Sequence, residues 1–147
     1  MKIKILTFNW HEPYLCLLSR LKHDFLVVEP EIASGHLRRW DKNMRPIPDN
    51  FTLISMAKAH KKLEEGAIDC IIAHNVKDLI TVQKYSLPKI IVFHNCLTTE
   101  IKLSKDKINR TEYLKKIEPL LDGTTKVFIP DLKKTDWKME GLSLIHI

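Results

Sequence analysis

Polar side chains that can bind ligands and transfer protons stand just after three short apolar segments of this sequence. They are Asn9, His11, Glu12, His74, Asn75, His94 and Asn95. Imidazole and carboxylate groups can accept a proton, and carboxamide groups can hold a polar ligand by hydrogen bonds. One such residue can simply cap the next helix, but three endings of the same kind favour a binding or catalytic site.

The apolar segments have the form of buried parallel strands. Short runs of isoleucine, valine, leucine and phenylalanine, separated by helical patterns, are typical of strands covered on both faces. The predicted strands are 2–8, 25–29, 51–54, 68–73, 89–93 and 126–129. Right-handed crossovers then give a single α/β domain with a doubly wound, mainly parallel, Rossmann-like sheet in the order 3-2-1-4-5-6. The polar residues would lie at its carboxyl edge, where such sheets bind ligands.

Helical periodicity accounts for most of the sequence between these strands. Ser55 is a predicted helix cap with Gly66 as the stop, and Asn75 with Asp78 resembles a capping box. The apolar face predicted for the first helix, which starts at Pro13, comprises Tyr14, Leu17, Leu18 and Leu21. The later helices are predicted over 111–121, which includes Pro119, and from a cap at Asp131 to about Trp137.

The turn after the first strand contains no glycine, which argues against an ordinary NAD site. A pyrophosphate needs glycine there in order to approach the backbone. The turn offers bulky side chains instead, because Trp10 can stack on a sugar or an aromatic ring, and His11 or Glu12 can accept a proton. The alternative is a plain helix start with Trp10 packed as a lid.

A long basic segment, 30–50, follows the second strand. Loops of this length without secondary structure of their own are usually functional or disordered. Arg38, Arg39 and Arg45 make this segment a candidate flap that contacts a phosphate or a lipid headgroup. A solvated loop with Trp40 packed on the core explains the same composition.

The amino-acid composition is that of a globular protein, with 44% apolar and 29% charged residues among the 147. The net charge of +6 can attract phosphates, nucleic acid or an anionic membrane surface. The apolar runs are of strand length and no signal-peptide pattern is present, so we expect a cytoplasmic protein. Cys16 and Cys70 fit the core, and Cys96 is a less favoured candidate nucleophile because nothing in the sequence shows that it would be ionised.

The N-W-H-E-P turn and the segments DCIIAHN, IIVFHN and VFIPDLKKTDW resemble the amino-terminal domain of GT-B-type glycosyltransferases, specifically the family 4-like group. The resemblance extends to Gly141. In that family a strand ending in Val-His-Asp, or a close variant, places a histidine at the interdomain cleft, and Phe93-His94-Asn95 matches it by position and type. The sequence departs from the family in lacking a glycine-rich first turn and in having Asn95 where an acidic residue is usual.

The resemblance implies that His94 is the catalytic residue, in contact with the transferred sugar or the acceptor. The expected substrate-binding residues are Asn9, Trp10, His11, Glu12, Arg38, Arg39, Arg45, His74 and Asn95. A nucleotide-sugar is the implied co-substrate, and the scheme requires neither a cofactor nor a metal. The expected partners are a sugar or lipid-linked acceptor, a carboxyl-terminal donor domain that this chain lacks, and a peripheral contact with the inner face of the membrane.

The last six residues match the translation of a sequencing adapter. Residues 142–147, LSLIHI, are the translation of CTG TCT CTT ATA CAC ATC, which is the mosaic-end adapter of transposon-based sequencing libraries. We therefore expect residues 1–141 to be the acceptor-side domain and residues 142–147 to be a sequencing artefact. The fragment alone would be inactive, because half of the cleft is missing. An ordinary apolar tail is the alternative.

Other function classes predict different features. A non-enzymatic flavodoxin-like ligand-binding or regulatory domain would be closed, with no apolar face for a second domain. A metal hydrolase would use His11, His74 and His94, but their sequence spacing has neither the H-E-x-x-H nor the H-x-H pattern. We do not expect nucleic acid as a partner, because the basic residues are scattered and lack interleaved aromatic residues outside the 30–50 segment.

Overall fold

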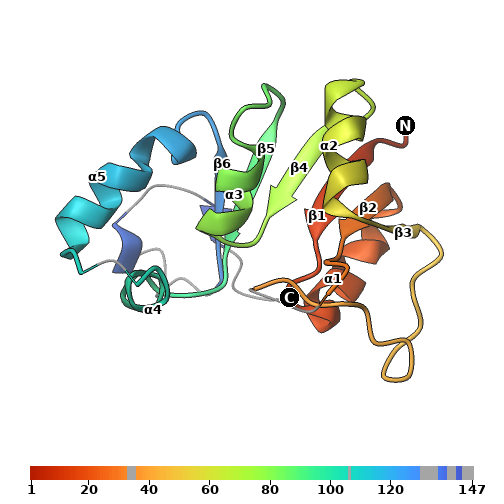
Figure 1. The fold of residues 1–147 in the computed structure, drawn as a ribbon, viewed down its shortest axis with the longest axis horizontal. Helices are drawn as coiled ribbons and strands as arrows, with labels where there is room; N and C mark the ends of the chain where they lie inside the picture. The colour runs from red at the N-terminus through yellow and green to blue at the C-terminus, as the bar shows by residue number, and fades with distance from the viewer. Residues whose placement is uncertain (33–35, 106, 130–135, 139–141, 144–147) are drawn as a thin grey trace. The chain divides into compact units, whose positions relative to one another are not determined.

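The computed structural model describes residues 1–32, 36–105, 107–129, 136–138 and 142–143 (Figure 1). The described part has the predicted α/β, Rossmann-like architecture, in which helices follow parallel strands. The strand order is β3-β2-β1-β4-β5-β6-β7, which confirms the predicted order of the first six strands. The chain divides into two compact units, Met1–Ile72 with Tyr85–Pro88, and Ala73–Lys84 with Lys89–Ile147.

The first unit is a parallel sheet with two helices. Its elements are β1 (Lys4–Phe8), α1 (Glu12–Leu18), η1 (Ser19–Leu21), β2 (Asp24–Val28), β3 (Phe51–Ile54), α2 (Met56–Glu64) and the start of β4 (Cys70–Ala73). β1 pairs with both β2 and β4, so Leu6 lies beside Leu26 on one side and Ile71 on the other. Four consecutive β1 residues, from Ile5 to Phe8, are buried. Both faces of the strand are therefore covered, as its largely apolar sequence predicts, and the one polar residue of this run, Thr7, donates its hydroxyl to the Ile72 carbonyl at 2.9 Å.

The face of the first helix was predicted wrongly. Leu15, which was not in the predicted apolar face, is fully buried, whereas Leu17 and Leu21 are 37% and 52% exposed. The helix changes from α to 3-10 geometry at Ser19 and ends at Lys22, whose φ is +55°. The 3.6-residue period therefore does not hold as far as Leu21.

The limits of α2 follow from its capping residues, as predicted. The Ser55 hydroxyl accepts a hydrogen bond from the Lys58 N–H at 3.2 Å, which satisfies one of the free donors of the first turn. Gly66 adopts a φ of +69° just beyond the last turn. Glycine enters this left-handed conformation without a steric penalty, so the helix ends there.

The second unit has its own sheet and helices. Its elements are the end of β4, α3 (Val76–Val82), β5 (Lys89–Phe93), α4 (Leu97–Leu103), α5 (Arg110–Leu121), β6 (Thr125–Phe128) and β7 (Leu142–Ser143). Phe93 and Phe128 stack at 4.7 Å between ring centroids, and the indole of Trp137 lies 4.4 Å from the Phe93 ring. These rings belong to a buried cluster that Ile117 and Leu121 of α5 complete.

Two findings differ from the expectations for this half of the chain, and one expectation is not tested. The connection after β5, in which no helix was predicted, contains the helix α4, whose Leu97 is fully buried. A further strand, β7, pairs with β6, and its two residues lie within the stretch attributed to adapter sequence. The predicted cap Asp131 lies outside the described residues.

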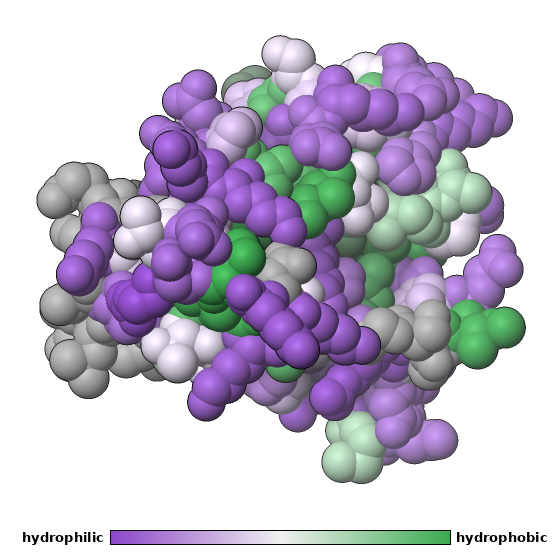
Figure 2. Space-filling model, turned by 60° about the vertical axis from the view of Figure 1, so that its left-hand side comes forward, coloured by the Kyte–Doolittle hydropathy of each residue, from purple (hydrophilic) through white to green (hydrophobic). Residues whose placement is uncertain are grey.

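The surface of the described residues is largely polar on the face that Figure 2 shows, with apolar side chains between hydrophilic ones. No described helix is both long and apolar enough to cross a lipid bilayer.

Candidate functional site

Two of the predicted histidines meet where β4 and β5 end. His74 follows Ala73, the last residue of β4, and His94 follows Phe93, the last residue of β5. The His74 Nδ1 and His94 Nε2 atoms are 3.1 Å apart, and the ring centroids are 5.2 Å apart with planes tilted by 41°. The His74 residue is only 3% exposed, whereas His94 is half-buried. His74 is therefore the buried ring of the pair, and His94 is the ring that solvent can reach.

The first turn of α3 fixes the backbone of His74. Asn75 Oδ1 accepts a hydrogen bond from the Asp78 N–H at 2.9 Å, and Asp78 Oδ2 accepts one from the His74 N–H at 2.9 Å. This confirms the predicted capping role of Asn75 and Asp78. Asp78 is fully buried, so its hydrogen bond to His74 is shielded from water.

The distance between the two imidazoles has a chemical consequence. In an N–H···N hydrogen bond one ring must be the donor and the other the acceptor, so the tautomers of His74 and His94 depend on each other. A ligand that forms a hydrogen bond with one ring therefore changes the tautomer that the other ring prefers. The pair can thus hold a hydroxyl group in a defined orientation and share a proton with it.

The residues after His94 are held by contacts with side chains from other parts of the second unit. Asn95 Nδ2 donates to Glu100 Oε1 at 2.9 Å, and the Asn95 carbonyl accepts from the Trp137 indole at 3.0 Å. The predicted substrate contact Asn95 therefore has a structural role in this conformation. The Cys96 thiol lies 3.1 Å from the Thr99 hydroxyl, and this hydrogen bond lowers the pKa of Cys96 below its ordinary value.

Asp136 fixes the start of α4. Its carboxylate accepts hydrogen bonds from the Leu97 N–H at 2.6 Å and from the Arg110 guanidinium at 2.9 Å. Burial alone would raise the pKa of Asp136, but the hydrogen bonds from Arg110 and Leu97 outweigh it, and the pKa lies below its usual value. Nothing in the sequence near Leu97 indicates this partner, which lies 39 residues further along the chain.

We expect Asp136→Asn to lower the free energy of unfolding by about 1 kcal/mol at pH 7, because the amide binds Arg110 less strongly than a carboxylate does. A carboxylate whose pKa is depressed by folding stabilises the protein above its unfolded-state pKa, and this stabilisation is lost as the pH falls through the folded-state pKa. The difference between variant and wild type should therefore shrink in acid. Urea denaturation at neutral and acidic pH measures it, and equal stability of the two proteins at pH 7 would contradict the role assigned to Asp136.

Side chains of the turn after β1 form hydrogen bonds with the segment that follows β2, within the first unit. Asn9 is fully buried, and its Nδ2 donates to the Arg38 carbonyl at 2.7 Å, while Asn9 Oδ1 has no hydrogen-bond partner among the described residues. Glu12 Oε1 accepts from the Asp41 N–H at 2.9 Å. Asn9 and Glu12 therefore hold the segment that follows β2. His11 is exposed, with its ring 5.3 Å from that of Trp10.

The basic segment is anchored by its tryptophan. Trp40 is 7% exposed and lies edge-on to Phe51 at 6.0 Å, so of the two alternatives left open for Trp40 the structure shows the one in which it packs on the core. Its backbone N–H donates to Glu29, and its indole donates to the Arg45 carbonyl. Arg38 and Arg39 are exposed. Arg39 lines a small groove, of about 310 Å³, with Glu29, Glu31 and Lys58.

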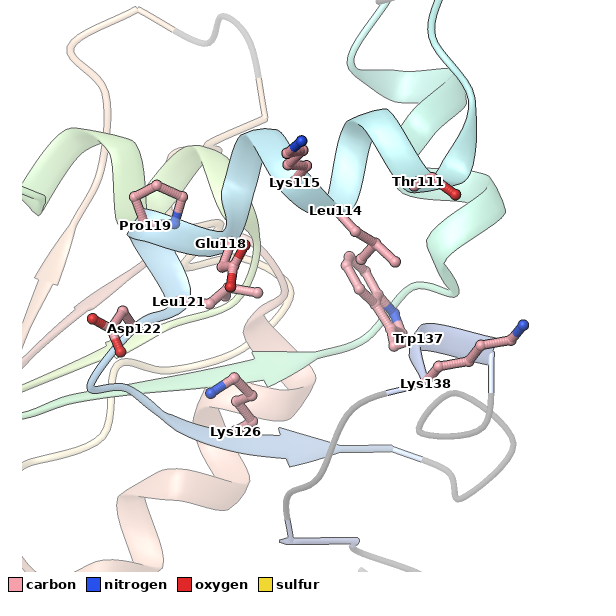
Figure 3. Close-up of a pocket in the computed structure, with 10 residues that line it drawn as sticks. All are labelled: Thr111, Leu114, Lys115, Glu118, Pro119, Leu121, Asp122, Lys126, Trp137 and Lys138. Carbon is pink, nitrogen blue, oxygen red and sulfur yellow. The ribbon is translucent and has the colours of Figure 1, made fainter.

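A larger groove of about 1030 Å³ runs beside α5 (Figure 3). Leu114 and Trp137 point toward one another in its wall, and Lys126 of β6 also lines it. The Trp137 ring thus borders this groove, while its indole N–H holds Asn95 one residue beyond the histidine pair.

Of the predicted site residues, the structure brings His74 and His94 into contact and places Asn95 next in the chain. The first unit holds the others, namely Asn9, Trp10, His11, Glu12, Arg38, Arg39 and Arg45. Among the described ranges, no three or more histidine, cysteine, aspartate or glutamate side chains are grouped so that they could hold a metal ion. Comparisons of the chain with protein-family models, with curated proteins and with solved structures found no match.

Proposed function

We propose that this chain is the acceptor-side domain of a GT-B-type glycosyltransferase of the family 4-like group, which moves a sugar from a nucleotide-sugar to an acceptor hydroxyl. The observation that carries the proposal is the hydrogen-bonded pair of His74 and His94 at the ends of β4 and β5. Two imidazoles at the carboxyl ends of parallel strands suit the binding of a polar, hydroxyl-rich ligand.

The reaction consists of attack by an acceptor oxygen on the anomeric carbon. A new carbon–oxygen bond forms as the bond between the anomeric carbon and the diphosphate breaks, the nucleotide leaves with the diphosphate, and the acceptor's hydroxyl proton passes to that diphosphate. Positive charge develops on the sugar ring and negative charge on the diphosphate, and preorganised dipoles stabilise both. His94 hydrogen-bonds the transferred sugar or the acceptor, and His74 positions the ring of His94. No step requires a metal or a cofactor.

The remaining predicted residues would recognise the acceptor. Arg38, Arg39 and Arg45 suit an anionic acceptor, such as one linked to a lipid phosphate. Asn9 and Glu12 support the segment that carries these arginines. A lipid-linked acceptor would bring the protein into peripheral contact with the membrane. The donor nucleotide-sugar would bind to a second Rossmann-like domain, so the chain alone would not transfer sugar.

The gene beyond codon 141 tests this proposal. We expect the reading frame, amplified from source DNA, to continue without the adapter codons into a second α/β domain with a nucleotide-sugar site. The reason is that the proposed reaction needs donor-binding residues on a second domain. Sequencing across the junction measures this directly. A stop codon soon after codon 141, or a continuation with no such domain, would contradict the glycosyltransferase assignment.

A further inference from the structure

The contact between His74 and His94 is close to the separation of two ligands on one metal ion. The His74 Nδ1 and His94 Nε2 atoms are 3.1 Å apart. Zinc binds imidazole nitrogens at 2.0–2.1 Å in tetrahedral geometry, which places two such nitrogens about 3.3 Å from each other. In the hydrogen bond the two nitrogens face each other. The rings must therefore separate by a few tenths of an ångström and tilt until both lone pairs point at the ion.

The surroundings of the two rings suit a metal site. The His74 residue is 3% exposed, and its backbone N–H donates to Asp78 Oδ2 at 2.9 Å, so the buried residue of the pair is held in place. His94 is half-buried, which gives an ion a path from solvent. A metal site needs both a supported ligand and an entry path. Both histidines belong to the second unit, so one compact unit contains the whole pair.

The chemistry of the ligands selects the kind of ion. Imidazole nitrogens suit zinc, copper and nickel, whereas magnesium and calcium prefer oxygen ligands. Within the ranges that the structure describes, no group of three or more histidine, cysteine, aspartate or glutamate side chains could hold a metal ion. Two protein ligands leave the remaining positions to water, so the ion would exchange readily with solvent.

We propose that His74 and His94 form a binding site for one exchangeable zinc ion, which the His74 Nδ1 and His94 Nε2 atoms coordinate. The hydrogen that joins the two rings leaves the contact, because the donor ring changes to the tautomer that carries its hydrogen on the other nitrogen. Both imidazoles stay neutral, and each then directs a lone pair at the ion.

Bound zinc would inhibit sugar transfer, because it occupies the two nitrogens that the proposed reaction uses. This consequence rests on the proposed function, whereas zinc binding itself does not. Zinc binding is measured without any transfer activity, so failure of the zinc site and failure of the glycosyltransferase proposal are separate results.

Isothermal titration calorimetry of the whole chain with zinc chloride, under reducing conditions, tests the site. Wild type should bind one zinc ion per chain at submillimolar concentration and should not bind magnesium. His94→Gln and His74→Gln should each weaken zinc binding about 100-fold, because a single imidazole remains and the gain from two linked ligands is lost. Circular dichroism shows whether each variant is folded, and the half-buried His94 supplies the decisive variant if His74→Gln does not fold.

His60→Gln and Cys96→Ser are the matched controls. His60 is also half-buried and hydrogen-bonded, to the Tyr85 hydroxyl at 2.8 Å, but it belongs to the first unit. Cys96 follows His94 by two residues, and a thiolate is also a zinc ligand. Both variants should bind zinc as tightly as wild type does. The proposal is overturned if wild type does not bind zinc, if His94→Gln binds it equally well, or if Cys96→Ser weakens binding as much as His94→Gln.

Discussion

Replacing Trp137 by alanine is expected to lower the free energy of unfolding by about 3 to 5 kcal/mol. The residue is fully buried, its ring lies 4.4 Å from Phe93, and its indole N–H donates to the Asn95 carbonyl at 3.0 Å. The variant loses this apolar packing, leaves a cavity beside Phe93, and deprives Asn95 of its donor. Urea denaturation followed by circular dichroism measures the change.

Trp10→Ala is the control for this prediction, because it removes the same side chain from a half-buried position in the first unit. Its cost should be less than half that of Trp137→Ala, since less apolar area returns to water. Equal costs for the two variants would show that Trp137 does not have the central packing role inferred from its burial.

The strands were predictable because their sequence requirement is local. A parallel strand covered on both faces needs mostly apolar residues; β2 and β5 each contain four in succession, and β1 is interrupted only by Thr7. Helix caps were predictable for the same reason, because Ser55 and Asn75 bind N–H groups only three residues away. Strand order followed from the rule that crossovers are right-handed.

Features that depend on contacts distant in sequence were not predictable. The helix α4 begins where Asp136 accepts from the Leu97 N–H, and no local pattern indicates a partner 39 residues away. The exposure of Leu21 follows the change to 3-10 geometry at Ser19, which the periodicity of the leucines does not show.

The candidate site was predictable in position but not in geometry. The chain pattern placed His74 and His94 at strand ends, and the topology makes those strands neighbours in the sheet order. The 3.1 Å contact between the rings depends further on strand register and side-chain rotamers. The burial of Trp40 was one of two open alternatives, because a tryptophan in a basic loop fits either a core contact or a ligand contact.

If the proposed function holds, replacing His94 by alanine reduces sugar transfer by the proposed two-domain enzyme about 100-fold or more in kcat, with a smaller change in KM. The proposed hydrogen bond from His94 strengthens as charge develops, and loss of one such preorganised group typically costs this much. His74→Ala should have a smaller effect, because His74 acts through the ring of His94. Combining the two changes should be no worse than His94→Ala alone, since residues that act as a unit are not additive.

The most direct measurement is the transfer rate of His94→Ala beside that of His60→Ala in the full-length protein. His60 is also half-buried and also hydrogen-bonded, to the Tyr85 hydroxyl at 2.8 Å, but it lies on α2 in the first unit. The account predicts that kcat falls about 100-fold for His94→Ala and stays within about threefold of wild type for His60→Ala. A His94→Ala enzyme that transfers sugar at the wild-type rate would contradict the catalytic role assigned to the histidine pair.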